Sequence, residues 1–107
     1  MMITTTDFIP GKRITEVLGV CRGNTIRARH VGKDILAGLK TLVGGEIQEY
    51  TKLIGEAREQ AIDRMMEEGR AMGADAIISV RFGTSYIMGT ASEILAYGTG
   101  VKLTDDR

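Results

Sequence analysis

The sequence predicts an α+β domain in which an antiparallel sheet carries one short and one long helix. Apolar residues alternate with a period of two near both ends of the chain, and between Gly32 and Gly73 they recur at helical spacing. Glycine and proline mark the points where the period changes. With 107 residues, of which 43% are hydrophobic and 26% charged, the chain has the composition of one globular domain. We therefore expect a single domain over residues 1–107.

Three strands are expected in the N-terminal third of the chain. A short threonine-rich strand covers residues 3–6 and is followed by a Pro-Gly turn. A second strand covers residues 13–22, where apolar side chains fall on alternate sides of the pleat. Gly23 and Asn24 can form a tight hairpin turn, because both residue types tolerate positive φ angles. The strand that follows this turn is expected over residues 25–30.

Two helices are expected in the middle of the chain. The short one covers residues 32–44, where five apolar residues recur at helical spacing before a Gly-Gly pair. The long one covers residues 46–72, about 27 residues or roughly 40 Å at about 1.5 Å per residue. A helix of this length overhangs a small core. Its methionine-containing apolar stripe is therefore expected to form the core, with a subunit contact along part of it as the alternative.

Two more strands are expected after the long helix, over residues 76–82 and 92–103. In the last strand Gly98 and Gly100 fall on the same face. Glycine at alternate positions removes the side chains from that face, which is typical of a place where another backbone or subunit packs closely.

Charge and hydropathy exclude several partners. The chain has 14 basic and 14 acidic residues, so no net charge attracts it to nucleic acid or to an anionic membrane. The N-terminus lacks the apolar core of a secretory signal, and the longest uncharged stretch, residues 82–92, is far shorter than the roughly 18 apolar residues of a membrane-spanning helix. We expect a soluble, cytoplasmic protein with neither a nucleic-acid nor a membrane partner.

Charge is distributed unevenly between the two parts of the chain. Residues 1–45 have 7 basic and 3 acidic side chains, a net charge of +4, whereas residues 46–107 have 7 basic and 11 acidic side chains, a net charge of −4. A solvated acidic helix beside basic strands explains this difference. The alternative is electrostatic matching between neighbouring subunits.

The residues that could do chemistry are few. Cys21 and His30 are the single cysteine and the single histidine, and a structural zinc site needs four ligands. In the expected hairpin the two side chains would be about four rungs, or roughly 13 Å, apart, too far for a nucleophile and its base. Neither Gly-Lys dipeptide has the spacing of a phosphate-binding loop. We therefore predict no catalytic residue, and an enzymatic activity is not expected.

Four segments in a fixed order resemble the YbjQ-like family of small bacterial proteins, whose members carry a heavy-metal-binding label. These segments are Leu42–Glu46, Tyr50-Thr51, Glu56–Ala61 and Gly73–Ile77. The resemblance implies a dodecin-subunit-like fold that assembles into a homo-oligomeric ring, expected to be a pentamer. It implies a binding module for a heavy metal or a small ligand; the alternative is an enzyme whose active site forms between subunits.

The resemblance also indicates which residues to examine. Its polar landmarks are Tyr50, Arg58 and Asp75, which are expected to line a ligand pocket between subunits; alternatively, Arg58 and Asp75 hold the helix to the sheet. A metal ion is the one cofactor that the resemblance suggests. Because one chain has too few soft ligands, a metal site in a ring would need Cys21 or His30 from several chains.

Overall fold

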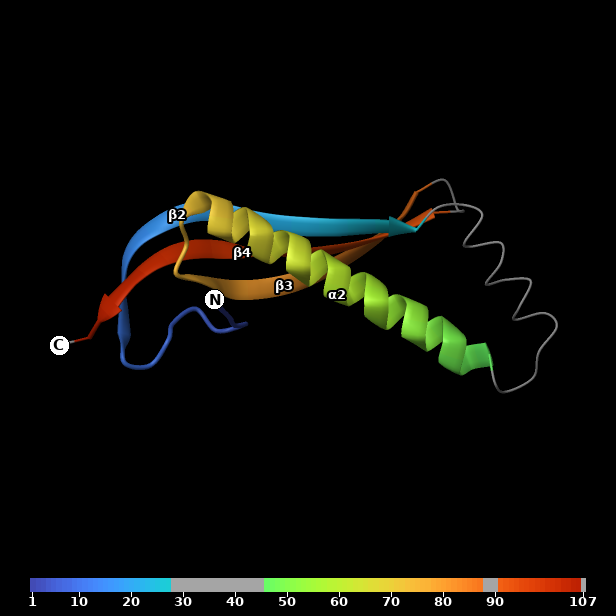
Figure 1. The fold of residues 1–107 in the computed structure, drawn as a ribbon, viewed down its shortest axis with the longest axis horizontal. Helices are drawn as coiled ribbons and strands as arrows, with labels where there is room; N and C mark the ends of the chain where they lie inside the picture. The colour runs from blue at the N-terminus through green and yellow to red at the C-terminus, as the bar shows by residue number, and fades with distance from the viewer. Residues whose placement is uncertain (28–45, 88–90, 107) are drawn as a thin grey trace.

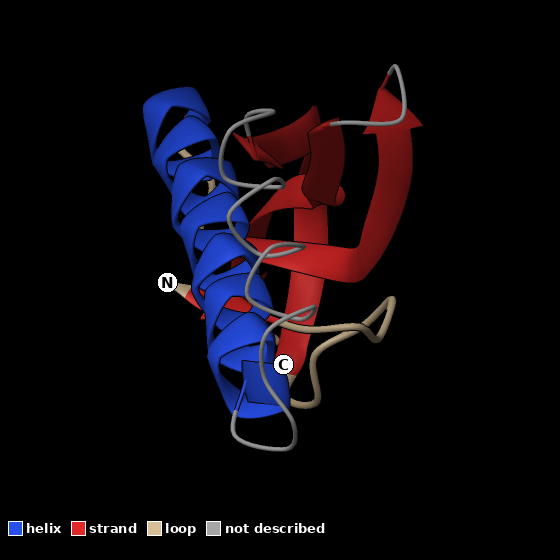
Figure 2. Cartoon of the chain, turned by 90° about the vertical axis from the view of Figure 1, so that its right-hand side faces the viewer, coloured by secondary structure: helices blue, strands red, loops and turns tan. Residues whose placement is uncertain are grey.

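The computed structural model describes residues 1–27, 46–87 and 91–106, in which one helix lies across one face of a four-stranded sheet (Figures 1 and 2). The strand order across the sheet is β1-β3-β4-β2. The elements are β1 (Met2–Ile3), β2 (Lys12–Arg27), α2 (Glu46–Met72), β3 (Ala76–Ile87) and β4 (Ala91–Asp105).

The α+β class is confirmed, but the predicted antiparallel sheet with two helices is wrong. The sheet is mixed, because β1 pairs with β3 in parallel while β2 and β3 each pair with β4 antiparallel. Within the described residues there is one helix, α2. The segment predicted as the short helix, residues 32–44, lies outside the described part of the chain. A period of two indicates a strand but carries no information about its direction relative to its neighbour, which is why the parallel pair was missed.

The predicted hairpin turn at Gly23 and Asn24 is also wrong. β2 continues through both residues and pairs with β4 along its length, from Lys12 opposite Asp105 to Arg27 opposite Ser92. The reason is the position of α2. A Cβ atom on Gly23 would overlap backbone atoms of the helix, so the glycine lets the helix approach the strand. The predicted third strand is thus the continuation of β2, and its residues 28–30 lie outside the described residues.

The long helix is confirmed over Glu46–Met72 and ends in a hydrogen-bonded cap. The Ala74 N–H donates to the carbonyl of Gly69 at 2.9 Å, and the Gly73 N–H donates to that of Arg70 at 3.0 Å. Gly73 has a φ of 84°, the left-handed conformation that this Schellman cap requires. No helix among the described residues is both long and apolar enough to cross a membrane.

The core has two parts, one on each face of the sheet. Under α2, Met65 is fully buried, so this methionine of the helical stripe belongs to the core of its own chain. On the other face, Ile9 packs in a smaller cluster with residues of β3 and β4. The residues of the first cluster are Cys21, Ala61, Met65, Ile77, Val80 and Ala96. Those of the second are Ile9, Ala76, Ile78 and Val101.

The close packing expected at the two glycines of β4 is confirmed, and the neighbours come from the same chain. A Cβ on Gly98 would lie 2.9 Å from the carbonyl oxygen of Ile78, and one on Gly100 would lie 2.9 Å from Sγ of Cys21. Both distances are shorter than ordinary contacts, so these glycines let β3 and the Cys21 side chain fit against β4.

Candidate functional site

Cys21 lies on β2, and its fully buried side chain contacts the last turn of α2. Its Sγ atom is 3.6 Å from Sδ of Met72. Two glycines make room for the sulfur, since a Cβ on Gly100 would be 2.9 Å from Sγ and one on Gly69 would be 3.5 Å from it. The fold therefore brings a thiol and a thioether into contact, although 51 residues separate them in the sequence.

The thiol of Cys21 is held in its protonated form. Burial raises the pKa of Cys21 above its ordinary value of 9.0, and the negative charge of Glu68 raises it further, while a hydrogen bond from the backbone of Gly100 acts in the opposite direction. Because the thiolate is the reactive species, Cys21 is not an activated nucleophile. Its burial also prevents it from facing a central pore. Cys21 therefore does not fit the expected metal site in which several chains of a ring each provide one ligand. His30 lies outside the described residues.

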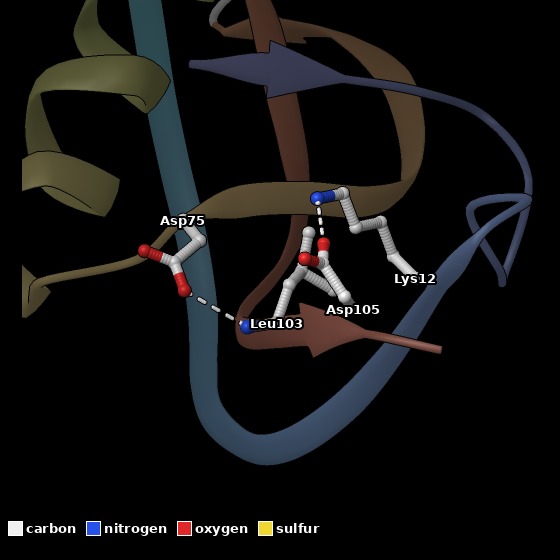
Figure 3. Close-up of polar contacts among 4 residues, drawn as sticks. All are labelled: Lys12, Asp75, Leu103 and Asp105. Carbon is white, nitrogen blue, oxygen red and sulfur yellow. Dashed lines mark hydrogen bonds and ion pairs between the residues drawn. The ribbon is translucent and has the colours of Figure 1, made fainter. Parts of the chain in front are cut away.

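Asp75 fastens the exit of α2 to strand β4 (Figure 3). Its backbone N–H donates to the carbonyl of Val101 at 2.8 Å, and its carboxylate Oδ2 accepts a hydrogen bond from the N–H of Leu103 at 2.8 Å. These contacts support the structural alternative for Asp75. A ligand-binding role for this residue stays a prediction.

A nearby ion pair joins the far ends of β2 and β4. Nζ of Lys12 lies 2.6 Å from Oδ1 of Asp105, and the two residues are register partners (Figure 3). The hydrogen bond from Lys12, together with its positive charge, lowers the pKa of Asp105. Both side chains are exposed, so we expect the pair to contribute little to stability.

Replacing Asp75 by alanine should lower the free energy of unfolding by about 1–2 kcal/mol, because the N–H of Leu103 loses a charged acceptor. Urea denaturation followed by circular dichroism measures this loss. Asp106→Ala, at a nearby exposed aspartate, is the control, with an expected change within about 0.5 kcal/mol. Unchanged stability in Asp75→Ala would contradict the structural role.

Arg58 lies on the exposed face of α2, beside a shallow hollow that is open to solvent. Its position is far from Asp75, because the 14 residues from Arg58 to Met72 span roughly 21 Å of helix. Tyr50 lies two turns before Arg58 in α2, and its side chain is outside the described part of the structure. One chain therefore does not bring Arg58 and Asp75 together, and a pocket containing both would need two subunits. The described residues lining the hollow are Lys52, Gly55, Glu56, Arg58, Glu59 and Gln60.

The helix also covers the outer edge of β2, a contact that sequence reasoning missed. Oε1 of Glu68 accepts a hydrogen bond from the N–H of Arg22 at 3.2 Å, and Nη1 of Arg64 donates to the carbonyl of Asn24 at 2.6 Å. The two side chains are four residues apart on one helix face. They satisfy backbone groups that would otherwise attract a strand of another molecule.

The sheet face opposite α2 exposes an apolar patch. Val20 is 60% exposed and Ile26 54% exposed, and both lie on the face of β2 that points away from Cys21. Tyr97 of β4 lies on the same face, because it pairs with Arg22. We call Val20, Ile26 and Tyr97 the outer patch. Arg22 and Asn24 lie between Val20 and Ile26 on this face, so the outer patch is a row of separate exposed apolar side chains that are available for contact with another molecule.

Comparison with known proteins decides the family. The YbjQ family model, described as "Putative heavy-metal-binding", matches residues 1–104. The chain belongs to the YbjQ family. A UPF0145 protein of Methanosarcina acetivorans is 59% identical over 103 residues, which cover 96% of this chain and 97% of that protein. A UPF0145 protein of Vibrio parahaemolyticus is 55% identical over 105 residues, which cover 98% of this chain and all of that protein.

A solved structure has a similar fold. It is a protein of unknown function of the DUF74 family from Pediococcus pentosaceus, with a TM-score of 0.56 and 18% sequence identity over 99% of this chain and 98% of that one. At this level of identity the similarity supports the fold alone. Membership of the YbjQ family thus gives a fold and a heavy-metal-binding description, but it does not say which residues would ligate a metal.

The heavy-metal description of the YbjQ family can be tested against the donor atoms of the described residues. These residues contain no group of three or more His, Cys, Asp or Glu side chains that could hold a metal ion. A structural zinc site of the usual kind is therefore not formed by them. The sulfur pair of Cys21 and Met72 does fit a soft metal, because thiolate and thioether are the ligands that such ions prefer.

Proposed function

We propose that this YbjQ-family protein is a cytoplasmic binding protein that works as a homo-oligomeric ring, most simply a pentamer, and takes a heavy-metal ion or a small ligand. The observation that carries the oligomer is the row of exposed apolar side chains along β2, where Val20 is 60% and Ile26 54% exposed.

A stable subunit interface buries about 800 Å² on each partner. The outer patch lies on the sheet face opposite α2, so its apolar side chains are available for such a contact.

A ring would also explain why Arg58 and Asp75 lie far apart within one chain. Contacts that join two different surfaces of the same chain close into a ring when the rotation between subunits permits. Arg58 then lies where a neighbouring chain could complete the hollow on α2 with groups such as Asp75. The charged side chains at the hollow have both signs, so the second candidate function is the binding of a small polar ligand between subunits.

The oligomer is tested by size-exclusion chromatography with light scattering, supported by native mass spectrometry. We expect a single species of five chains, each of 11.6 kDa. A monomer at micromolar concentration would overturn the ring. A closed ring with another number of chains would overturn the pentamer but retain the binding protein.

A further inference from the structure

The sulfur atoms of Cys21 and Met72 are spaced like two ligands of one metal ion. Sγ and Sδ are 3.6 Å apart. In a three-coordinate site with metal–sulfur bonds of about 2.3 Å and angles of about 120°, two sulfurs lie about 4.0 Å apart. An ion can therefore bridge this pair with only a small shift of the Met72 side chain, which has three rotatable bonds and adapts easily.

A third donor and a route from solvent lie at the same place. Glu68 is one turn before Met72 on α2. Its carboxylate Oε1 accepts a hydrogen bond at 3.2 Å from the N–H of Arg22, the residue that follows Cys21 in the chain. Met72 is 37% exposed, whereas Cys21 is fully buried. An ion would thus arrive at the thioether and come to rest against the thiol.

We infer that Cys21 and Met72 form the binding site of a soft monovalent metal ion, of the class of Cu(I) and Ag(I), within a single chain. This inference rests on the proposed binding function and identifies its site and its metal class. A soft monovalent ion can be held by three ligands of which two are sulfur atoms, whereas zinc at a structural site requires four ligands. The site therefore selects Cu(I) over Zn²⁺.

Binding exchanges a proton for the metal. The S–H bond of Cys21 breaks, the sulfur forms a bond to the metal, and the proton leaves to solvent, while the oxidation state of the ion does not change.

The experiment uses the purified full-length protein under oxygen-free conditions, with Cu(I) delivered from a coloured Cu(I)-specific chelator whose absorbance reports the transfer. Native mass spectrometry counts the ions per chain. The variants are Met72→Leu and Cys21→Ala, with Met66→Leu as the matched control, since Met66 is another methionine of α2, packed against the core cluster. Thermal melts show that each variant is folded.

We expect one Cu(I) per chain in the unmodified protein. Affinity should fall at least tenfold in Met72→Leu, be lost in Cys21→Ala, and stay unchanged in Met66→Leu. Unchanged binding in Met72→Leu and Cys21→Ala would overturn this site while the protein remained a metal-binding one. Equal losses in Met72→Leu and Met66→Leu would also overturn it. Absence of Cu(I) binding together with tight binding of Zn²⁺ would overturn the metal class. Light scattering tests the oligomer independently, so failure of the ring and failure of the metal site are distinguishable.

Discussion

Gly23→Ala is expected to lower the free energy of unfolding by about 3 kcal/mol or more, at the upper end of what overpacking costs. The added Cβ would overlap the carbonyl oxygen of Ala61 and the backbone nitrogen of Met65, and it would lie 2.7 Å from the carbonyl carbon of Arg64. All three are backbone atoms, so no change of rotamer relieves the overlap. The helix must move away from β2, which opens the core around Met65.

Urea denaturation monitored by circular dichroism measures this effect. Gly83→Ala is the matched control, because Gly83 also lies in a strand and a Cβ there meets no atom within 4 Å. Alanine in an open strand position should leave stability unchanged or raise it by up to about 1 kcal/mol. Equal stability of the two variants would mean that α2 does not rest on β2 as described.

The same glycine explains the main error in the fold predicted from the sequence. A turn and a close backbone contact both select a residue without a Cβ, so Gly23 followed by Asn24 was interpreted as a hairpin. The strand pattern nevertheless continues through this point. Cys21, Gly23 and Thr25 are buried while Arg22, Asn24 and Ile26 are exposed, a period of two without interruption. The missing information was the identity of the partner, which is α2 and lies far along the chain.

The long helix could be predicted because its signals are local. Apolar residues recur at helical spacing from Ile47 onward, and Gly73 ends the helix in a cap formed by residues close in sequence. The parallel pairing of β1 is different, since it joins Met2 to Ala76 through hydrogen bonds that no short pattern encodes. Local periodicity thus predicts elements, whereas pairings between distant segments require the structure.

The candidate site residues also differ in how much of their environment the sequence predicts. The resemblance indicates Asp75 as a landmark, but its hydrogen bonds are made to β4, where Leu103 lies 28 residues further along the chain. Met72 was interpreted as core filler, because methionine at helical spacing is usually that. Its contact with Cys21 appears only once α2 is placed on β2.

The double substitution Val20→Glu and Ile26→Glu is expected to convert the oligomer to monomers. Each residue lost from a buried contact removes about 1.5–3 kcal/mol of apolar stabilisation. Each introduced carboxylate must in addition be removed from water without a partner. In a ring the substitutions act at every subunit contact that uses the outer patch, so the losses accumulate over the whole assembly.

The isolated chain should tolerate the same change, because Val20 and Ile26 are already 60% and 54% exposed. Circular dichroism should therefore show a folded protein, while light scattering shows a mass near 11.6 kDa. Thr5→Glu with Thr104→Glu adds the same charge at exposed positions outside the outer patch and should leave the oligomer intact. If Val20→Glu with Ile26→Glu keeps the mass of the unmodified protein, the subunit contact does not use the outer patch. If both double variants dissociate, added negative charge rather than loss of the apolar contact is the cause, and the outer patch again loses its role.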